Sequence, residues 1–439
     1  MKFVNQHHDD TKVIQAHTCC CQSNKLLDIH SSALRAPSPY VLGEGENVGR
    51  YLEEKTVIIA IPVLLVGGTE IQTLSVVKAL ISAGYRVIVC CYHEYVQDIV
   101  EQFEAVGAKV KLLQLKREYH IPGLLSLGLS LAKVFRSLNP DMIHVQYIAP
   151  GLIPIIAARL AGVPVVLATV HIAGSVVYGV KTKMMLRIAA KLCSAFICVS
   201  KGVEEFWFGS SMVFDMEKVP HNRKHFTIYN AVDIDKITKM NKAESGVLRR
   251  SLNLHERLVI GIVGRLALQK GHTILLDALV EIKNKYPNVA LLVIGDGPER
   301  QSLQLKADKL GLTDVILWLG AKSQDDVFNY YQVMDIFVMP SLYEGFGLTA
   351  AEAMACELPV VSSNVAGLSE VIEHEKSGLL VSSGDSDALK LALLRLIEDR
   401  DMAFGYGVYG RQRVQSLFSL RTFEQTMLNM YHRYLTDSI

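Results

Sequence analysis

The sequence predicts an α/β protein made of two doubly wound parallel sheets. The first observation is an apolar, largely β-branched run at 56–64, TVIIAIPVL, which lacks polar alternation and is typical of a strand buried on both faces. The second is that such runs alternate with helical stretches, the order that produces a parallel sheet. The third is that the pattern starts again near Leu258, in a chain of 439 residues that is too long for one core.

The first set of elements begins at Thr56. A glycine turn and a helix occupy 66–84, and a second helical stretch, LLSLGLSLAKVFRSL, occupies 124–138. A short strand and a linker follow at 226–237, FTIYNAVDIDKI. The strands expected in this set are 56–64, 85–92, 109–115, 141–147, 164–171 and 195–200.

The second set repeats the alternation. A helix at 271–287 ends at a proline, as helices commonly do. The strands expected here are 258–266, 290–298, 315–320, 336–341 and 359–363. Two such sets predict two Rossmann-like domains that face each other across a cleft, with ligands beyond the carboxyl ends of the strands.

These patterns divide the chain into four segments. A polar, irregular N-terminal part is expected to be a flexible extension, and the last residues are expected to form helices that cross back to the first domain. The segments are 1–54 (extension), 55–228 (first Rossmann-like domain), 229–405 (second Rossmann-like domain) and 406–439 (C-terminal helices).

Composition excludes some classes of protein. A net charge of +1 gives no field that favours nucleic acid. Most of the eight cysteines lie in apolar stretches, as expected for reduced thiols in a cytosolic protein, and Cys19 to Cys21 lack the spacing of a zinc site. We find no signal-peptide pattern in residues 1–30, and we expect 149–170 to form a buried helix, a turn and a strand rather than a membrane span.

Two glutamates, Glu344 and Glu352, have seven residues between them in PSLYEGFGLTAAEAMACELPVV. Gly345 and Gly347 would let the chain turn sharply into the helix that contains the second glutamate. The N-terminus of that helix offers unpaired N–H groups and a partial positive charge, which suit an anion. Acids on either side of a bound anion fit a nucleotide-sugar, although Glu352 could instead cap backbone and Glu344 could simply be exposed.

Two cations and two further turns precede or follow this motif. Arg265 and Lys270 in GRLALQKG could hold a diphosphate, or could be a solvated surface pair. Gly295 and Gly297 in GDGP could let the backbone approach a ligand, or could form an ordinary turn. The turn at 367–369 in NVAGLSEVI again offers N–H groups before a helix.

These motifs together resemble the retaining GT-B glycosyltransferases of family 4, also called group 1. The resemblance rests on GRLALQKG, GDGPER, PSLYEGFGLTAAEAMACELPVV and AGLSEVI, in that order. It is close over 258–381 and looser over 56–439. It implies the GT-B fold, with a nucleotide-sugar donor bound by the second domain and an acceptor bound by the first.

The resemblance also implies a role for each matching residue. Arg265 and Lys270 correspond to the cations that hold the donor diphosphate. Glu344 corresponds to the acid that contacts the hydroxyls of the donor sugar, and Glu352 to the acid that binds the ribose. The other donor-site residues, all on glycine turns, are Gly67, Gly68, Gly295, Gly297, Gly345, Phe346, Gly347 and Leu348.

His171 in ATVHIAG corresponds to a histidine near the transferred sugar. Ile172 replaces the Asp that often follows, and a packed histidine after a strand is the alternative. With Glu344, Arg265 and Lys270, His171 makes up the expected catalytic set.

The family transfers a sugar from a nucleotide donor with retention at the anomeric carbon, so the chain is expected to be a hexosyltransferase of class EC 2.4. The resemblance implies front-face attack through an oxocarbenium-like state, with charge on the leaving diphosphate opposed by cations and helix N-termini. We therefore expect no metal and no other cofactor, and a UDP- or GDP-linked donor. Asp233 and Asp235 resemble a metal-binding D-x-D, but they follow the linker and are expected to form a turn and a helix cap.

The acceptor is expected to be a glycan or a lipid-linked glycan, most often in the assembly of cell-surface polysaccharide or glycolipid. KTKMMLRIAAKL combines basic and apolar residues that could contact an anionic membrane, or could form an ordinary amphipathic helix with a solvated face. We expect a cytoplasmic protein, at the inner face of the membrane if this contact forms. The basic residues concerned are Lys181, Lys183, Arg187 and Lys191.

Other protein classes remain open at this point. A nucleotide-sugar 2-epimerase of the same fold would need no acceptor, and a non-catalytic descendant would bind the nucleotide-sugar as a partner subunit. A dehydrogenase is disfavoured because neither VGGTEIQ nor GDGPER is a full G-x-G-x-x-G.

Overall fold

The computed structural model describes residues 55–147, 152–172, 180–220, 222–238 and 242–436. All of them fall within one compact unit, Gly45–Ile439. The expected N-terminal extension and the cysteines at 19–21 lie outside the described residues.

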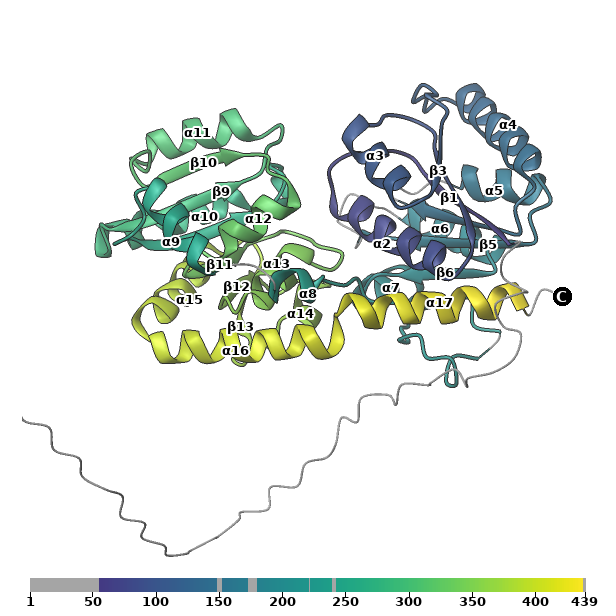
Figure 1. The fold of residues 1–439 in the computed structure, drawn as a ribbon. Coiled ribbons are helices and arrows are strands. Elements are labelled where there is room, and N and C mark those ends of the chain that lie inside the picture. The colour runs from purple at the N-terminus through teal and green to yellow at the C-terminus, as the bar shows by residue number, and fades with distance from the viewer. Residues whose placement is uncertain (1–54, 148–151, 173–179, 221, 239–241, 437–439) are drawn as a thin grey trace, which may run out of the picture. The chain divides into compact units, whose positions relative to one another are not determined.

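The first sheet has seven parallel strands in the order β3-β2-β1-β4-β5-β6-β7 (Figure 1). Each of the six strands expected from the sequence is present, and the short strand expected beside the linker joins the sheet as β7. The strands are β1 (Thr56–Ile61), β2 (Arg86–Cys91), β3 (Lys109–Leu112), β4 (Met142–Tyr147), β5 (Val165–Val170), β6 (Ala195–Cys198) and β7 (His225–Thr227).

Both faces of this sheet are covered by helices. Successive residues of β1 enter different cores, because side chains alternate across a strand. Val57 and Ile59 pack with α2 (Gly68–Ser82), α3 (Gln97–Ala105) and α17 (Leu420–Thr436). Ile58 and Ala60 pack with the helices of the opposite face, which are α4 (Ile121–Leu138), α5 (Ile153–Leu160) and α6 (Val180–Leu192).

The second sheet has six parallel strands in the order β10-β9-β8-β11-β12-β13. The last of these was not expected from the sequence. Its four residues, GLLV, are too few to show a pattern. The strands are β8 (Leu258–Val263), β9 (Val289–Ile294), β10 (Ile316–Gly320), β11 (Ile336–Met339), β12 (Val360–Ser363) and β13 (Gly378–Val381).

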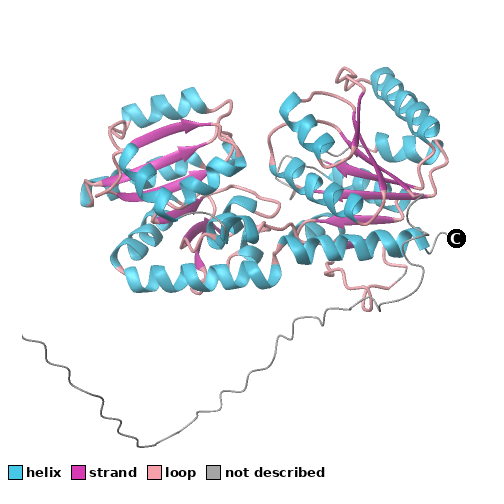
Figure 2. Ribbon diagram, viewed as in Figure 1, coloured by secondary structure: helices cyan, strands magenta, loops and turns pink. Residues whose placement is uncertain are grey.

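Helices again lie on both sides of the sheet (Figure 2). One side carries α10 (His272–Lys285), α11 (Arg300–Lys309) and α15 (Ser386–Glu398). The other carries α12 (Gln324–Tyr331), α13 (Leu348–Ala355), α14 (Leu368–Val371) and α16 (Arg400–Leu417). The remaining short elements are α7 (Lys201–Phe208), α8 (Ile234–Thr238), α9 (Lys242–Ser251) and the 3₁₀ turn Leu268–Lys270.

The predicted fold class is confirmed: two parallel, doubly wound sheets follow each other along the chain. In each sheet the strand order reverses direction beside the first strand of the set, between β1 and β4 and between β8 and β11. Such a switch point opens a crevice at the carboxyl ends of the strands. The loops after β1, β5, β8 and β11 carry most of the predicted site residues.

Candidate active site

The loop after β11 leads directly into α13. Gly347 is the N-cap residue of α13 and has a φ of 99°, a conformation that favours glycine. It offers no side chain to cap the helix, and no acidic residue occupies the first turn. The N-terminus of α13 is therefore suited to an external anion, and anion binding there stays a prediction.

Lys270 and Glu344 form an ion pair at this place. The Nζ–Oε2 distance is 2.6 Å, and the two side chains are only 17% and 16% exposed. The two loops are also joined by their backbones, since the Leu342 amide donates to the Gln269 carbonyl at 2.8 Å. The residues assigned to the diphosphate and to the sugar thus contact each other, so Glu344 is not merely exposed.

Arg265 lies on the same loop as Lys270. Its side chain is exposed and makes no ion pair with any residue that the structure describes. Gly295 and Gly297 pack under this loop: a Cβ at Gly295 would lie 1.9 Å from the Gly264 carbonyl oxygen, and the Leu266 amide donates to the Asp296 carbonyl at 3.0 Å. Close packing between two loops explains both glycines, and their contact with a ligand stays a prediction.

Glu352 is buried in α13 and is 7% exposed. Its carboxylate accepts hydrogen bonds from the Tyr331 hydroxyl at 3.0 Å and from Gln324 Nε2 at 3.2 Å. Burial raises the pKa of Glu352 to about 7, although both hydrogen bonds act to lower it. The side chain does not cap backbone, and the sequence did not predict its two partners.

His171 directly follows β5. Its Nε2 lies 2.8 Å from Gln146 Oε1, and burial lowers its pKa to about 4, so the ring is neutral near pH 7. Because an amide oxygen only accepts, Nε2 carries the proton and Nδ1 keeps a lone pair. Gln146, which the sequence did not single out, therefore fixes the tautomer of His171.

A second buried histidine, His144, lies near the His171–Gln146 pair and makes hydrogen bonds of its own. His144 Nδ1 lies 2.5 Å from the Tyr431 hydroxyl of α17, and its Nε2 lies 2.7 Å from Thr169 Oγ1. Burial lowers the pKa of His144 to about 3. His144, Gln146, Thr169 and His171 all line a cavity of about 20 Å³, which is large enough for one water molecule.

Predicted site residues from the two sheets lie next to each other. A Cβ at Gly68 would come within 2.9 Å of Leu348 Cδ1, and a Cβ at Gly345 would come within 2.0 Å of the His171 carbonyl oxygen. Gly67 is the N-cap residue of α2, beside the carboxylate of a buried glutamate, Glu70. The fold therefore brings the first glycine turn, His171 and the start of α13 together.

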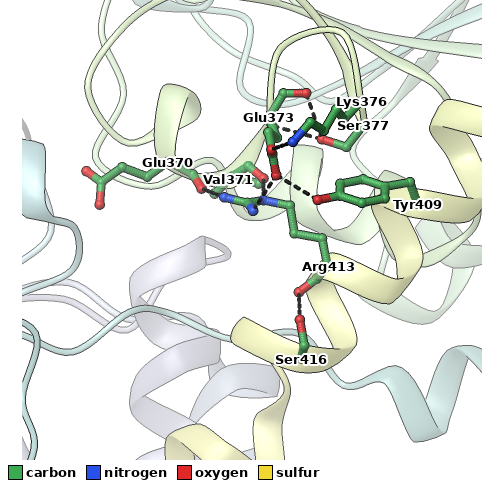
Figure 3. A network of polar contacts seen from close by, with 8 residues as sticks. All are labelled: Glu370, Val371, Glu373, Lys376, Ser377, Tyr409, Arg413 and Ser416. Carbon is green, nitrogen blue, oxygen red and sulfur yellow. Dashed lines mark hydrogen bonds and ion pairs between the residues drawn. The ribbon is translucent and has the colours of Figure 1, made fainter. Parts of the chain in front are cut away.

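The turn at 367–369 lies beside a group of polar contacts. It leads into α14, which has only four residues, and Glu370 of this helix accepts hydrogen bonds from the Lys201 and Gly202 amides at 2.9 and 2.7 Å. The Arg413 guanidinium donates to the Glu370 and Val371 carbonyls at 2.8 and 2.9 Å (Figure 3). The Glu370 bonds hold α14 against the start of α7, and contact between the amides of the turn and a ligand stays a prediction.

The first residue of the D-x-D-like pair caps a helix, as the sequence predicted. Asp233 Oδ1 accepts a hydrogen bond from the Lys236 amide at 3.0 Å, so Asp233 caps α8. Among the described residues, no three or more His, Cys, Asp or Glu side chains are placed to hold a metal ion.

Two models of protein families match the chain. The model "Glycosyltransferase Family 4" matches residues 66–236, and the model "Glycosyl transferases group 1" matches residues 246–413. An Escherichia coli protein, UDP-Gal:alpha-D-GlcNAc-diphosphoundecaprenol alpha-1,3-galactosyltransferase, is 30% identical over 62% of this chain and 70% of its own length. This chain belongs to glycosyltransferase family 4. It is thus a glycosyltransferase of a retaining family, as the resemblance implied.

Other relatives of this family-4 glycosyltransferase act in several settings. The Staphylococcus aureus capsular polysaccharide biosynthesis glycosyltransferase CapM is 28% identical over 74% of this chain and 86% of its own length. The Mycobacterium tuberculosis GDP-mannose-dependent alpha-(1-6)-phosphatidylinositol monomannoside mannosyltransferase is 31% identical over 42% of this chain and 49% of its own length, so that match spans about half of the relative.

The solved structures show the fold. A crystal structure of Anabaena HepE (Alr3699) in complex with UDP and glucose has a TM-score of 0.73 and 21% identity, and the match covers 86% of this chain and 99% of HepE. The GT-B fold expected from the sequence is therefore confirmed. The roles of individual residues stay predictions.

Proposed function

We propose that this glycosyltransferase moves a hexose from a UDP- or GDP-linked donor to a hydroxyl of a glycan or lipid-linked glycan, with retention at the anomeric carbon. The observation that carries the proposal is the contact between Lys270 and Glu344 at the open N-terminus of α13, with Glu352 one helical turn deeper. A cation, a helix terminus and two acids in this order match the parts of a nucleotide-sugar: diphosphate, sugar hydroxyls and ribose hydroxyls.

In the proposed reaction, the bond between the anomeric carbon and the β-phosphate oxygen breaks while the acceptor oxygen bonds to the same face of that carbon. The acceptor proton leaves with the departing phosphate oxygen. Negative charge grows on the diphosphate, where Arg265, Lys270 and the first amides of α13 stabilise it. These groups supply positive charge without a metal ion, so no cofactor is part of the proposal.

The tautomer of His171 defines the role of this residue in the proposed reaction. Its Nδ1 lone pair can accept a hydrogen bond from a donor-sugar hydroxyl, while Gln146 holds the other nitrogen at 2.8 Å. A ring with a pKa near 4 stays neutral during turnover at pH 7, so it orients the sugar and adds no charge.

The proposed setting is the assembly of cell-surface polysaccharide or glycolipid. The support for it is the names of the relatives: one acts in capsule biosynthesis, one on a diphosphoundecaprenol-linked sugar and one on a phosphatidylinositol mannoside. Their donors differ, since one is named for UDP-galactose and another for GDP-mannose.

The first test is a thermal-shift screen with UDP, GDP, ADP and their common sugar conjugates. A ligand that binds only the folded protein raises its melting temperature. We expect a shift with uridine or guanosine nucleotides that is lost in Lys270→Ala. The control is Lys306→Ala, which removes another partly exposed lysine of the same half, one that is paired with Asp277 at 2.6 Å.

The second test adds acceptors to the donor found in the screen and follows sugar transfer. Transfer to a lipid-linked or free glycan supports the proposal. Conversion of the donor at C2 without an acceptor would instead identify an epimerase. A nucleotide-dependent shift with no reaction would identify a binding subunit, and no shift with any nucleotide would overturn the donor site.

A further inference from the structure

Helix α4 has an unusual surface for a helix of a doubly wound domain. Among the described residues it is the one helix with the length and hydropathy of a membrane span, with a mean hydropathy of 1.3, yet only 22% of it is buried. Leu131 and Phe135 do pack into the core of the first sheet. The helix therefore packs one part of its apolar surface on the sheet and leaves another part uncovered.

The exposed apolar residues of α4 form a stripe. Ile121, Leu125 and Leu129 are 75%, 61% and 69% exposed, and a spacing of four places them on one face of the helix. Tyr119, just before the helix, is 82% exposed. Single exposed leucines are common on protein surfaces, but a continuous stripe of this kind marks an interaction site.

Further exposed apolar residues lie on the neighbouring helices of the same face of the sheet. In the view of Figure 1, α4 lies at the outer edge of the first sheet with α5 and α6 following, and α5 packs against both of its neighbours. Arg136 at the end of α4 donates to the carbonyl of Leu160, which ends α5 and is 58% exposed. On α6, Met184 and Ile188 are 57% and 43% exposed.

The segment that contains α4, α5 and α6 is strongly basic. Residues 119–203 contain eight lysines and arginines but a single acidic residue, Asp141, a balance of +7 in a chain whose net charge is +1. Helices α4, α5 and α6 contain no Asp or Glu. Lys133 lies four residues after Leu129 on α4 and is exposed, and so are Lys181 and Lys191 on α6. An apolar stripe with basic residues beside it matches an anionic lipid surface.

We propose that the face formed by α4, α5 and α6 docks on the surface of an anionic bilayer, with the Ile121–Leu129 stripe inserted at the level of the lipid headgroups. This rests on the proposed function and deepens it, because it would hold the acceptor-binding half where a lipid-linked acceptor is embedded. It also extends the contact expected from the sequence, which concerned α6 alone, to α4.

The test is co-sedimentation of the full chain with vesicles of phosphatidylcholine alone, or of phosphatidylcholine with phosphatidylglycerol at roughly two to one. We expect binding to the anionic vesicles only. Leu125→Ser with Leu129→Ser should abolish it, and Lys133→Glu with Lys181→Glu should weaken it roughly tenfold or more. Both pairs are exposed, so the fold should tolerate the changes.

Matched controls come from the second half of the chain. Leu391→Ser with Phe404→Ser replaces two apolar residues that are 63% and 71% exposed, and Lys309→Glu reverses an exposed charge on α11. These variants should bind anionic vesicles as the wild type does. Loss of binding in the controls, equal binding to both vesicle types or no binding by the wild type would overturn the proposal.

Two further measurements separate this proposal from its alternatives. The α4 variants should keep the nucleotide-dependent thermal shift. A wild type that shows this shift but does not bind anionic vesicles would contradict only the membrane proposal and not the proposed function. Size-exclusion chromatography should show the same oligomeric state for the wild type and Leu125→Ser/Leu129→Ser. A dimer that the double substitution dissociates would assign the stripe to a second copy of the chain and overturn the proposal.

Discussion

The ionisation of Glu352 gives the sharpest quantitative prediction. Burial raises its pKa from an ordinary value of 4.5 to about 7, a difference of roughly 2.5 units. Each pKa unit corresponds to about 1.4 kcal/mol. The free energy of unfolding therefore falls by about 3 kcal/mol when this side chain ionises inside the folded protein. The raised pKa means that the Glu352 carboxyl stays protonated up to a higher pH in the folded state than in the unfolded state. The free energy of unfolding should therefore fall as the pH rises from about 4.5 to 7 and should stay level above 7.

Glu352→Gln keeps the shape of the side chain and removes the titration. We expect the variant to match the wild type near pH 4 and to be more stable by about 3 kcal/mol at pH 8, measured by urea unfolding at both values. Glu256→Gln, which changes an exposed acid, should follow the wild type at both values. Parallel pH profiles for the wild type and Glu352→Gln would refute the burial argument.

Three other predictions concern the same site. Gln146→Ala should lower kcat while leaving the nucleotide-dependent thermal shift intact, because His171 loses the bond that sets its tautomer; an unchanged kcat would contradict that role. Lys270→Ala should remove the thermal shift, whereas Glu344→Ala should keep it and abolish turnover, and identical phenotypes would contradict the division of roles between them. Gly347→Ala should cost roughly 1–2 kcal/mol of stability in urea unfolding, since a side chain there is strained at a φ of 99°, and an unchanged midpoint would contradict this.

The sequence predicted the two sheets well because their strands are buried on both faces. Continuous apolar runs such as TVIIAIPVL need no knowledge of their neighbours to be recognised. The GLLV strand β13 was missed for the opposite reason, since four residues carry no period. The site loops were predicted because their glycines and charges are local in the sequence.

The partners of the site residues were not predicted, because they are distant in the chain. Gln146 is 25 residues from His171, and Tyr331 is 21 residues from Glu352. Only strand register and helix packing bring such pairs together. A signal existed for one of them: in DMIHVQY, His144 and Gln146 alternate within a strand that is otherwise apolar, and buried polar residues need partners.

The exposed face of α4 was hidden for a different reason. Its apolar residues cover a wide arc of the helix, so the hydrophobic period could not show which part of that arc faces the sheet and which part faces outward. Only the packing of Leu131 and Phe135 on the sheet fixes the orientation and leaves Leu125 and Leu129 exposed.

The two glutamates of the motif show how environment separates two identical side chains. Glu352 is held by neutral donors and lies near its titration point at pH 7, whereas Glu344 is paired with Lys270. In the proposed function, an arriving diphosphate competes for Lys270 and frees the Glu344 carboxylate for the sugar hydroxyls. Until a donor binds, the ion pair between Lys270 and Glu344 keeps both groups in position without leaving a partly buried charge unpaired. Donor binding then exchanges one partner of Lys270 for another, which costs less than desolvating a free lysine and a free carboxylate separately.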